Sequence, residues 1–416
     1  MANTNFTING VDIEKNFVPK EYVIDRYAEL PNTFKTPTLW ACGANDRGQL
    51  GDNTIQTQSS PIQTISGGAN WKYVTVGDGL VGGIKTDGTL WMWGYNDFGQ
   101  LGDNTTTNKS SPVQTVAGGT NWKQIESDST GTRERYVAAI KTDGTLWLWG
   151  MNNNMLGSGG WLGTNDTTNY SSPVQTVAAG TNWKQVSPGG RHCGAIKTDG
   201  TLWMWGMNTF GTLGTNNTTS YSSPVQTVSG GTNWRQVSCG PEHTAAIKTD
   251  GTLWSWGRAA FGSLGTNDTT NRSSPVQTVA GGTNWKQVSC GNFRTSSIKT
   301  DGTLWMWGGG GSGALGDNTT TDKSSPVQTI AGGTNWKQIS SRFNSSGAIK
   351  SDGSLWVWGA NSVGAQSGIL GTNNITNYSS PVQTVAAGTN WKQVATGIQN
   401  TAFIRDDSSD IYGDPY

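Results

Sequence analysis

Proton transfer in catalysis is most often carried out by histidine, and the chain has very few histidines. His192 and His243 are the only two histidines, and they stand 51 residues apart at matching places of a repeat. Equivalent positions share one structural task, so we expect both to be structural. No Ser-His-Asp set, nucleophile elbow or phosphate-binding glycine loop occurs. The sequence therefore predicts a protein that is not an enzyme, with no catalytic residue and no cofactor.

Metal binding is equally poorly supported by the residue types. The four cysteines are Cys42, Cys193, Cys239 and Cys290, and none forms a Cys-x-x-Cys pair. We interpret all four as small buried apolar residues, since repeat-equivalent cysteines lie too far apart for a disulfide. Loops such as 265–268 offer oxygen atoms to Ca²⁺ but lack a full ligand series. We expect no metal site.

Partner binding is the chemistry that the remaining residues favour. Trp, Tyr and Arg are the side chains most often found as interface anchors. Three insertions, 127–135, 152–162 and 365–369, all fall at one end of the repeats. We predict a partner-binding surface there. Its candidate residues are Arg133, Arg135, Tyr136, Trp161, Arg191, Phe293 and Arg294. For Trp161 an alternative stays open, in which the indole fills a gap beneath its own loop.

Charge and hydropathy exclude two further classes of partner. The 28 Lys and Arg residues balance 28 Asp and Glu residues, and charged residues make up only 13% of the chain. Nucleic-acid binding requires a basic surface that is missing here. No run approaches the roughly 18 apolar residues of a membrane span. We expect no nucleic acid, no membrane insertion and, from the N-terminal residues, no signal peptide.

A repeat organises most of the chain. The dipeptide Leu-Trp recurs with its Trp at 40, 91, 147, 203, 254, 305 and 356, so the spacing is 51 or 56 residues. In six copies Asp-Gly precedes Leu-Trp, as at Asp250-Gly251, which predicts a two-residue type I′ hairpin turn. In that copy we expect strands at 235–239, 244–248, 252–256 and 275–279, here called positions A to D. Four short antiparallel strands per repeat describe a propeller blade.

The repeat count also predicts how the ring closes. Strands C and D occur seven times from Trp40, and strands A and B occur seven times up to Arg405. The fold class is therefore all-β, a seven-bladed β-propeller whose last blade joins 392–405 to 38–65. Strand A should be innermost, because small residues follow its central Val or Ile at Thr75, Ser127, Ser187, Ser238, Ser289, Ser340 and Ala395. The predicted domains are an N-terminal extension (1–35), the propeller (36–406) and a tail (407–416).

The N-terminal extension carries a helical pattern. Pro19 favours a helix start, Pro31 prevents continuation, and Val23, Tyr27 and Leu30 share one face. One interpretation is packing against the propeller itself. The other is a docking arm for another protein, with Phe17, Tyr22, Val23, Tyr27 and Leu30 as contact residues.

The motifs resemble those of the regulator of chromosome condensation repeat family. The matching segments are Gly-x-x-His-Thr at 240–244, Asp-Gly-x-Leu-Trp-x-Trp-Gly, and x-Gly-x-Leu-Gly as at 210–214, and the likeness covers about 38–405. The resemblance implies a seven-bladed propeller. The family's nucleotide-exchange function depends on loops without a match here, and its bacterial members include protein inhibitors of β-lactamase. The first twelve residues also look like those of structural proteins of tailed bacteriophages.

Together these observations lead to two functional hypotheses. The first is a structural or adhesion component of a bacteriophage virion, assembled in the host cytoplasm and released by lysis. Its partners would be other virion proteins through the extension, a host-surface molecule, and further copies of the chain. The alternative is a soluble protein-binding propeller of inhibitor or regulator type.

Overall fold

The computed structural model describes residues 37–65, 70–128, 135–153, 159–229, 231–362 and 368–406 in full. It also describes the backbone of a short hairpin, in which β1 (Thr7–Ile8) pairs with β2 (Val11–Asp12). The chain divides into two units, Pro37–Asp406 and the two ends Met1–Thr36 with Asp407–Tyr416. The predicted helix and the docking-arm residues Phe17, Tyr22, Val23, Tyr27 and Leu30 lie outside the described residues.

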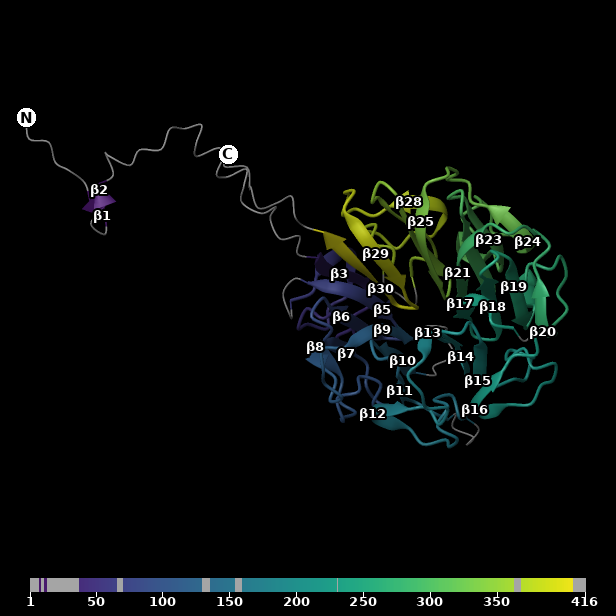
Figure 1. Ribbon diagram of the computed structural model, residues 1–416. Helices are drawn as coiled ribbons and strands as arrows, with labels where there is room; N and C mark the ends of the chain where they lie inside the picture. The colour runs from purple at the N-terminus through teal and green to yellow at the C-terminus, as the bar shows by residue number, and fades with distance from the viewer. Residues whose placement is uncertain are drawn as a thin grey trace, which may run out of the picture. The chain divides into compact units, whose positions relative to one another are not determined.

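The unit Pro37–Asp406 is a seven-bladed β-propeller of four-stranded antiparallel sheets, as predicted (Figure 1). Blade 1 contains β5 (Trp71–Val76), β6 (Leu80–Lys85), β7 (Leu90–Gly94) and β8 (Lys109–Gln114). Blade 2 contains β9 (Trp122–Ser127), β10 (Tyr136–Lys141), β11 (Leu146–Gly150) and β12 (Tyr170–Gln175). Blade 3 contains β13 (Trp183–Pro188), β14 (His192–Lys197), β15 (Leu202–Gly206) and β16 (Tyr221–Gln226).

The remaining blades repeat the order A, B, C, D. Blade 4 contains β17 (Trp234–Cys239), β18 (His243–Lys248), β19 (Leu253–Gly257) and β20 (Arg272–Gln277). Blade 5 contains β21 (Trp285–Gly291), β22 (Arg294–Lys299), β23 (Leu304–Gly308) and β24 (Lys323–Gln328). Blade 6 contains β25 (Trp336–Arg342), β26 (Ser345–Lys350), β27 (Leu355–Gly359) and β28 (Tyr378–Gln383). The 3₁₀ turns η1 (Ala260–Gly262) and η2 (Gly311–Gly313) lie in C–D links.

Blade 7 closes the ring with strands from both ends of the propeller. It contains β29 (Trp391–Thr396), β30 (Asn400–Asp406), β3 (Pro37–Gly43) and β4 (Gln58–Gln63) in that order. The ladder between β3 and β30 runs from Pro37 opposite Asp406 to Gly43 opposite Asn400. The predicted closure is therefore confirmed. It leaves no blade with half of its strands missing.

The Asp-Gly hairpins differ in detail from the predicted type I′ turn. Among the described residues, Gly251 has a positive φ of 81° and Asp250 does not, whereas type I′ requires positive φ at both. The N–H of Gly251 donates to the carbonyl of Lys248 at 3.0 Å, which places the turn one residue earlier. Hydrogen bonds from Thr252 hold the pKa of Asp250 below its ordinary value. The Asp250 carboxylate thus stabilises the turn through Thr252, and Gly251 is the last residue of the turn.

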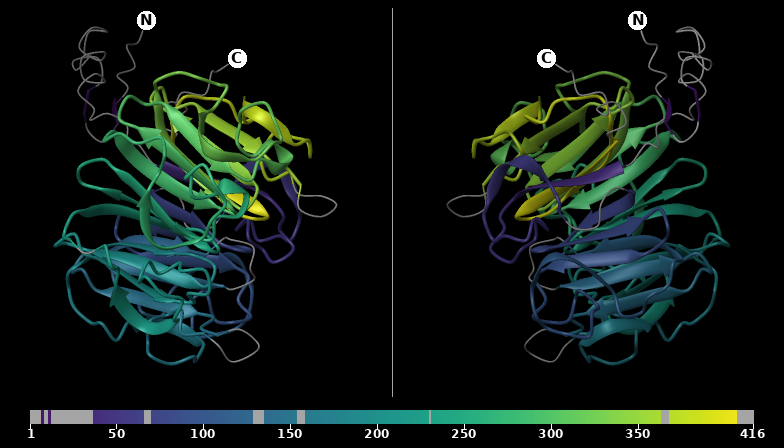
Figure 2. Two further views of the ribbon diagram at one scale, coloured as in Figure 1. Left: turned by 90° about the vertical axis from the view of Figure 1, so that its right-hand side faces the viewer. Right: turned by 90° about the vertical axis from the view of Figure 1, so that its left-hand side faces the viewer.

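Tryptophans of strands A and C form the apolar layers between blades. Trp256 is completely buried, and its ring centroid lies 6.0 Å from that of Trp234. Trp254 is only partly buried, and the Lys248 ammonium lies 4.4 Å from its ring centroid. The side views in Figure 2 show the blades stacked around the ring. Aromatic surface is thus covered by the neighbouring blade, and cations cover the outer part.

Strand A is innermost, as expected, and lines a central channel of about 190 Å³. One part of the small-residue expectation is wrong. The residue that directly follows Ile125 is Glu126, and it lines the channel, whereas Ser127 comes one place later. Among the described residues, no helix has the length and apolar character that crossing a membrane requires.

Candidate partner-binding face

The A–B hairpins and the starts of the C–D links meet at one end of the propeller. In each blade the first residue after strand C donates its backbone N–H to the tip of the A–B hairpin. In blade 4, for example, Arg258 donates to the carbonyl of Glu242 at 2.8 Å. The equivalent bonds join Tyr95 to Gly79, Met151 to Arg135, Met207 to Arg191, Gly309 to Phe293, Ala360 to Asn344 and Ala44 to Gln399. These tips and link starts together are here called the loop face.

Three phenylalanines from different blades and one arginine gather on the loop face. The guanidinium carbon of Arg258 lies 4.9 Å from the ring centroid of Phe210 and 5.3 Å from that of Phe293. Phe261 packs edge-on against Phe293 with centroids 5.6 Å apart. Glu242 forms an ion pair with Arg258. We call Phe210, Arg258, Phe261 and Phe293 the Phe–Arg cluster.

Two members of this cluster have an unfavourable backbone conformation. Phe261 has φ 58° and Phe293 has φ 53°, and Phe343 on the next A–B hairpin has φ 38°. The left-handed region costs a residue with a side chain about 1–2 kcal/mol and favours Gly or Asn. Phe261 also remains 51% exposed. The left-handed backbone and the exposed ring each lower the stability of the fold, and together they present aromatic side chains at the surface. This pattern occurs at functional sites.

A second part of the loop face is a pocket of about 350 Å³ around Tyr95. Arg135 stacks on the Tyr95 ring with its guanidinium carbon 4.2 Å from the centroid, and Arg47 lies at 5.6 Å. Arg135 also forms an ion pair with Asp78 at 2.7 Å. Arg47 is the more exposed cation, with half of its side chain accessible. The pocket therefore offers an aromatic platform and a guanidinium to a ligand.

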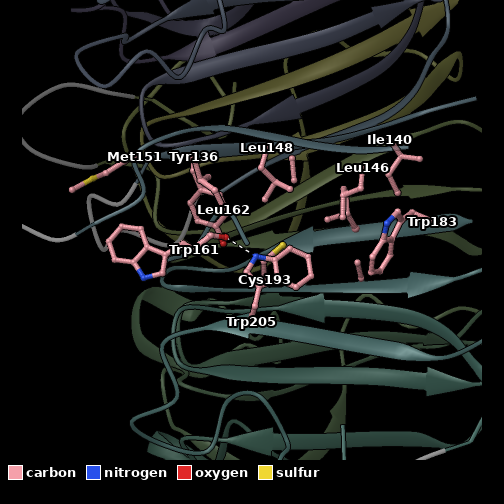
Figure 3. Close-up of a cluster of buried hydrophobic side chains, with 13 residues drawn as sticks. Tyr136, Ile140, Leu146, Leu148, Met151, Trp161, Leu162, Trp183, Cys193 and Trp205 are labelled. Carbon is pink, nitrogen blue, oxygen red and sulfur yellow. Dashed lines mark hydrogen bonds between the residues drawn. The ribbon is translucent and has the colours of Figure 1, made fainter. Parts of the chain in front are cut away.

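The structure corrects three of the predicted contact residues. Trp161 is 1% exposed, Tyr136 is fully buried and Arg294 is 1% exposed, so none of these side chains can serve as a surface anchor. Figure 3 shows Trp161 and Tyr136 within a buried cluster that includes Leu162 and Trp205. Arg191 and Phe293 lie on the loop face, Arg135 lies in the Tyr95 pocket, and Arg133 lies outside the described residues.

Trp161 is buried because it belongs to the repeat. The segment Gly160-Trp161-Leu162-Gly163 matches Gly211-Thr212-Leu213-Gly214 of the next blade. The carbonyl of Trp161 accepts a hydrogen bond from the Trp205 indole at 2.7 Å, and that of Thr212 accepts one from Trp256 at 2.8 Å. The alternative interpretation of Trp161, packing beneath its own loop, is therefore the one that the structure supports.

The histidines have the same structural surroundings. His192 Nε2 is 2.9 Å from the hydroxyl of Thr244, and His243 Nε2 is 3.1 Å from that of Thr295 in the following blade. Burial lowers the pKa of His192 to about 3 and that of His243 to about 4. Both imidazoles are thus neutral at pH 7, and each connects two blades.

The cysteines are buried and free, and burial raises the pKa of the thiols, to about 12 for Cys239 and about 11 for Cys290. Such thiols are protonated at neutral pH and poor nucleophiles. Within the described residues no group of three or more His, Cys, Asp or Glu side chains is arranged to hold a metal ion.

The residues that the sequence reasoning missed are Phe210, Arg258 and Phe261. The sequence signal for them was the Phe that precedes Gly-x-Leu-Gly in three repeats, at Phe98, Phe210 and Phe261. Nothing in the sequence indicates that Phe293 and Arg258 join them, because the four residues come from three blades.

Comparisons with known proteins agree with this architecture. A family model described as the RCC1-like domain matches residues 34–337. The ultraviolet-B receptor UVR8 of Arabidopsis thaliana is 32% identical over 296 residues, which are 70% of this chain and 64% of that protein. The human E3 ubiquitin-protein ligase HERC2 is 28% identical over 292 residues, 65% of this chain but only 6% of that protein. The matches thus span less than two thirds of either relative.

Solved structures show the same fold at lower identity. Yeast RCC1 (Prp20), in a crystal structure bound to Kap60, has a TM-score of 0.75 at 16% identity, covering 92% of this chain and 91% of that one. Human WBSCR16 has a TM-score of 0.73 at 18% identity, covering 89% of this chain and 99% of that one.

Proposed function

Because the chain belongs to the RCC1-like domain family, we propose that it is a non-enzymatic, protein-binding propeller of the regulator type. The named relatives are a receptor and a ubiquitin-protein ligase, and they support this alternative over the virion hypothesis. The ligase match covers a small part of that protein, so its enzymatic activity is not transferred to this chain.

The virion hypothesis has no support from these relatives, which are plant and human proteins. Location in a particle, adhesion to a host surface and docking through the N-terminal extension stay predictions from the sequence. Mass spectrometry of purified particles from the source would test them directly. Finding the intact chain in many copies per particle would reinstate the hypothesis.

The observation that carries the proposal is the Phe–Arg cluster. Exposed Phe261 and its neighbour Phe293 have left-handed backbones, although glycine at these tips would avoid the strain. Arg258 lies between two of the rings and keeps 39% of its side chain accessible. Aromatic residues and arginine gathered in one patch are typical of interface hot spots. We propose that a protein partner contacts the loop face at this cluster.

Photo-crosslinking tests where the partner binds. A benzophenone amino acid is placed at Phe261 or, as a control, at Val279 in the same blade. The two side chains are 51% and 53% exposed, but Val279 follows strand D at the other end of the blade. In an extract of the source cells we expect the Phe261 position to label one protein and the Val279 position to label none.

A second arm tests the cluster itself. Phe293→Ala and Arg258→Gln, added to the Phe261 probe, should reduce the labelling at least fivefold while circular dichroism stays unchanged. Equal labelling from both ends of the blade, or labelling that survives both substitutions, would contradict the proposed site.

A further inference from the structure

The channel wall follows a hydrogen-bonding rule that joins each blade to the next. In blade 4 the carboxamide of Gln236 donates to the carbonyl of Val288 at 3.1 Å and accepts from the Val288 N–H at 3.1 Å. Both polar atoms of the side chain are therefore used. The glutamines that follow this rule are Gln124, Gln185, Gln236, Gln287, Gln338 and Gln393.

A second ring of bonds lies two residues further along strand A. The hydroxyl of Ser238 accepts from the N–H of Cys290 in the next blade at 2.9 Å. The hydroxyls that accept in this way are those of Thr75, Ser187, Ser238, Ser289 and Ser340. The channel wall is thus mostly structural.

Three neighbouring positions depart from these rules. Tyr73 occupies the glutamine position of blade 1, and Glu126 occupies the hydroxyl position of blade 2. The N–H that Glu126 would receive from blade 3 is missing, because Pro188 stands there and proline has no N–H donor. The substitutions occur together in blades 1 to 3. Bonds of the two rings are lost at these positions, and Tyr73 and Glu126 bond to each other instead.

The departing residues form a polar cluster with an arginine from across the channel. The hydroxyl of Tyr73 donates to the carboxylate of Glu126. Arg342, at the end of strand A in blade 6, approaches with its Nη2 3.7 Å from Glu126 Oε2. Burial raises the pKa of Glu126 above its ordinary value, although Arg342 and Tyr73 oppose the change.

Arg342 lacks the hydrogen bonds that a buried guanidinium normally has. Its side chain is 13% exposed, and its buried Nη1 has no hydrogen-bond partner among the described residues. A buried N–H of a charged group without an acceptor lowers the stability of the fold, so we expect an acceptor to bind there. The nearby Ser289 hydroxyl accepts from Ser341, the residue before Arg342, so both belong to one part of the wall.

The hydrogen-bonding capacity left in the channel consists mainly of donors. Each glutamine uses its oxygen and one N–H in the wall, and Glu126 faces Tyr73 and Arg342. The hydroxyls of Ser187 and Ser238 each accept a backbone N–H, and each also bonds to a buried thiol, Cys239 or Cys290, whose sulfur is only a weak acceptor. Guanidinium and hydroxyl donors in a polar cavity are the groups that hold phosphate, sulfate and carboxylate.

We propose that the central channel binds one small oxyanion, of the size of phosphate, on the guanidinium of Arg342 and the channel hydroxyls. The cavity of about 190 Å³ accommodates such an ion with a few waters, since each water occupies about 30 Å³. The Tyr73–Glu126 pair holds the carboxylate on one side of the guanidinium and leaves Nη1 to the anion. This inference does not depend on the proposed function, because it concerns the channel and not the loop face.

Calorimetric titration of the full chain with inorganic phosphate tests the proposal, with chloride at matched ionic strength as the reference. We expect one saturable site per chain that chloride does not reproduce. Arg342→Gln should weaken phosphate binding at least tenfold. Arg258→Gln, which removes a guanidinium from the loop face, is the matched control and should leave it unchanged.

The Glu126→Gln variant is the decisive test, because the proposal predicts the direction in which its phosphate affinity changes. Removing the carboxylate removes repulsion, so phosphate should bind at least fivefold more tightly. Weaker binding in Glu126→Gln would overturn the proposal, as would an absent signal or a response that Arg342→Gln leaves intact. If Arg342→Gln fails to fold, Arg342→Lys is the substitute variant. It keeps the positive charge but lacks the paired N–H donors of the guanidinium, so it should weaken phosphate binding about fivefold. The Glu126→Gln test does not depend on either variant.

Discussion

Two tryptophans of one strand differ in what they contribute to stability. Trp256 is fully buried between blades, and its indole N–H donates to Thr212 of the preceding blade. Trp256→Ala should lower the free energy of unfolding by about 3–5 kcal/mol, the usual cost of a large buried aromatic. Trp254 is only partly covered, so Trp254→Ala should cost about 1–2 kcal/mol. Urea titration followed by far-ultraviolet circular dichroism separates the two, and equal losses would contradict this difference in burial.

The buried histidines predict how stability depends on pH. Their folded pKa values of about 3 and about 4 lie below the ordinary 6.5. In acid the unfolded chain therefore binds protons that the folded chain does not. The free energy of unfolding that the neutral histidines maintain above pH 6.5 is lost as the pH falls toward 4. Each histidine should contribute a loss of about 1.5 kcal/mol between pH 6.5 and 5.

Urea titrations at these two pH values check this expectation. The variant His192→Gln with His243→Gln is the matched comparison, because it lacks both titrating groups. Its loss of stability between pH 6.5 and 5 should be smaller by about 3 kcal/mol. An identical loss in the two proteins would show that other groups control the acid response.

At the scale of strands, one position leaves the hydroxyl ring incomplete. Ala395 of β29 stands where five other blades present Ser or Thr, so the N–H of Val76 receives no side-chain hydroxyl. Ala395→Ser should supply the acceptor and raise the free energy of unfolding by about 0.5–1.5 kcal/mol. Ala402→Ser, one strand further out at a fully buried place, is the control and should destabilise. Thermal melts of both variants decide, and a loss in Ala395→Ser would contradict the rule.

The strands and blades could be predicted because the same sequence pattern occurs in seven copies. The alternation around each Leu-Trp places the apolar residues, and the count of A, B, C and D strands fixes the closure. The features that were predicted wrongly or missed depend on contacts or comparisons between different repeats. The match of Gly160-Trp161-Leu162-Gly163 to the repeat was hidden by an insertion. Glu126 contacts Tyr73 of blade 1 and Arg342 of blade 6, both far from it in sequence. The Phe–Arg cluster likewise unites three blades, which a single repeat cannot reveal.

At the scale of the whole molecule, the ring should depend on its shared blade. Deleting 37–63 removes β3 and β4 and leaves the outer edge of β30 without a partner. The hydrogen-bonded ladder and the packing of blade 7 are lost together, so the truncated chain should not fold cooperatively. Calorimetry of the truncated chain checks this expectation. A melt as sharp as that of the intact propeller would show that six blades and a half suffice.

The register of the closing ladder also determines how the ring responds to force. Pro37 lies opposite Asp406 at the outer end of the β3–β30 ladder, so a load applied at these two residues pulls on one pair at a time. Such peeling opens a ladder like a zipper, whereas a shearing load would strain all its hydrogen bonds together. The propeller is therefore mechanically weakest where its two ends meet. Tension transmitted along the chain would open blade 7 first and leave the other blades to yield in turn.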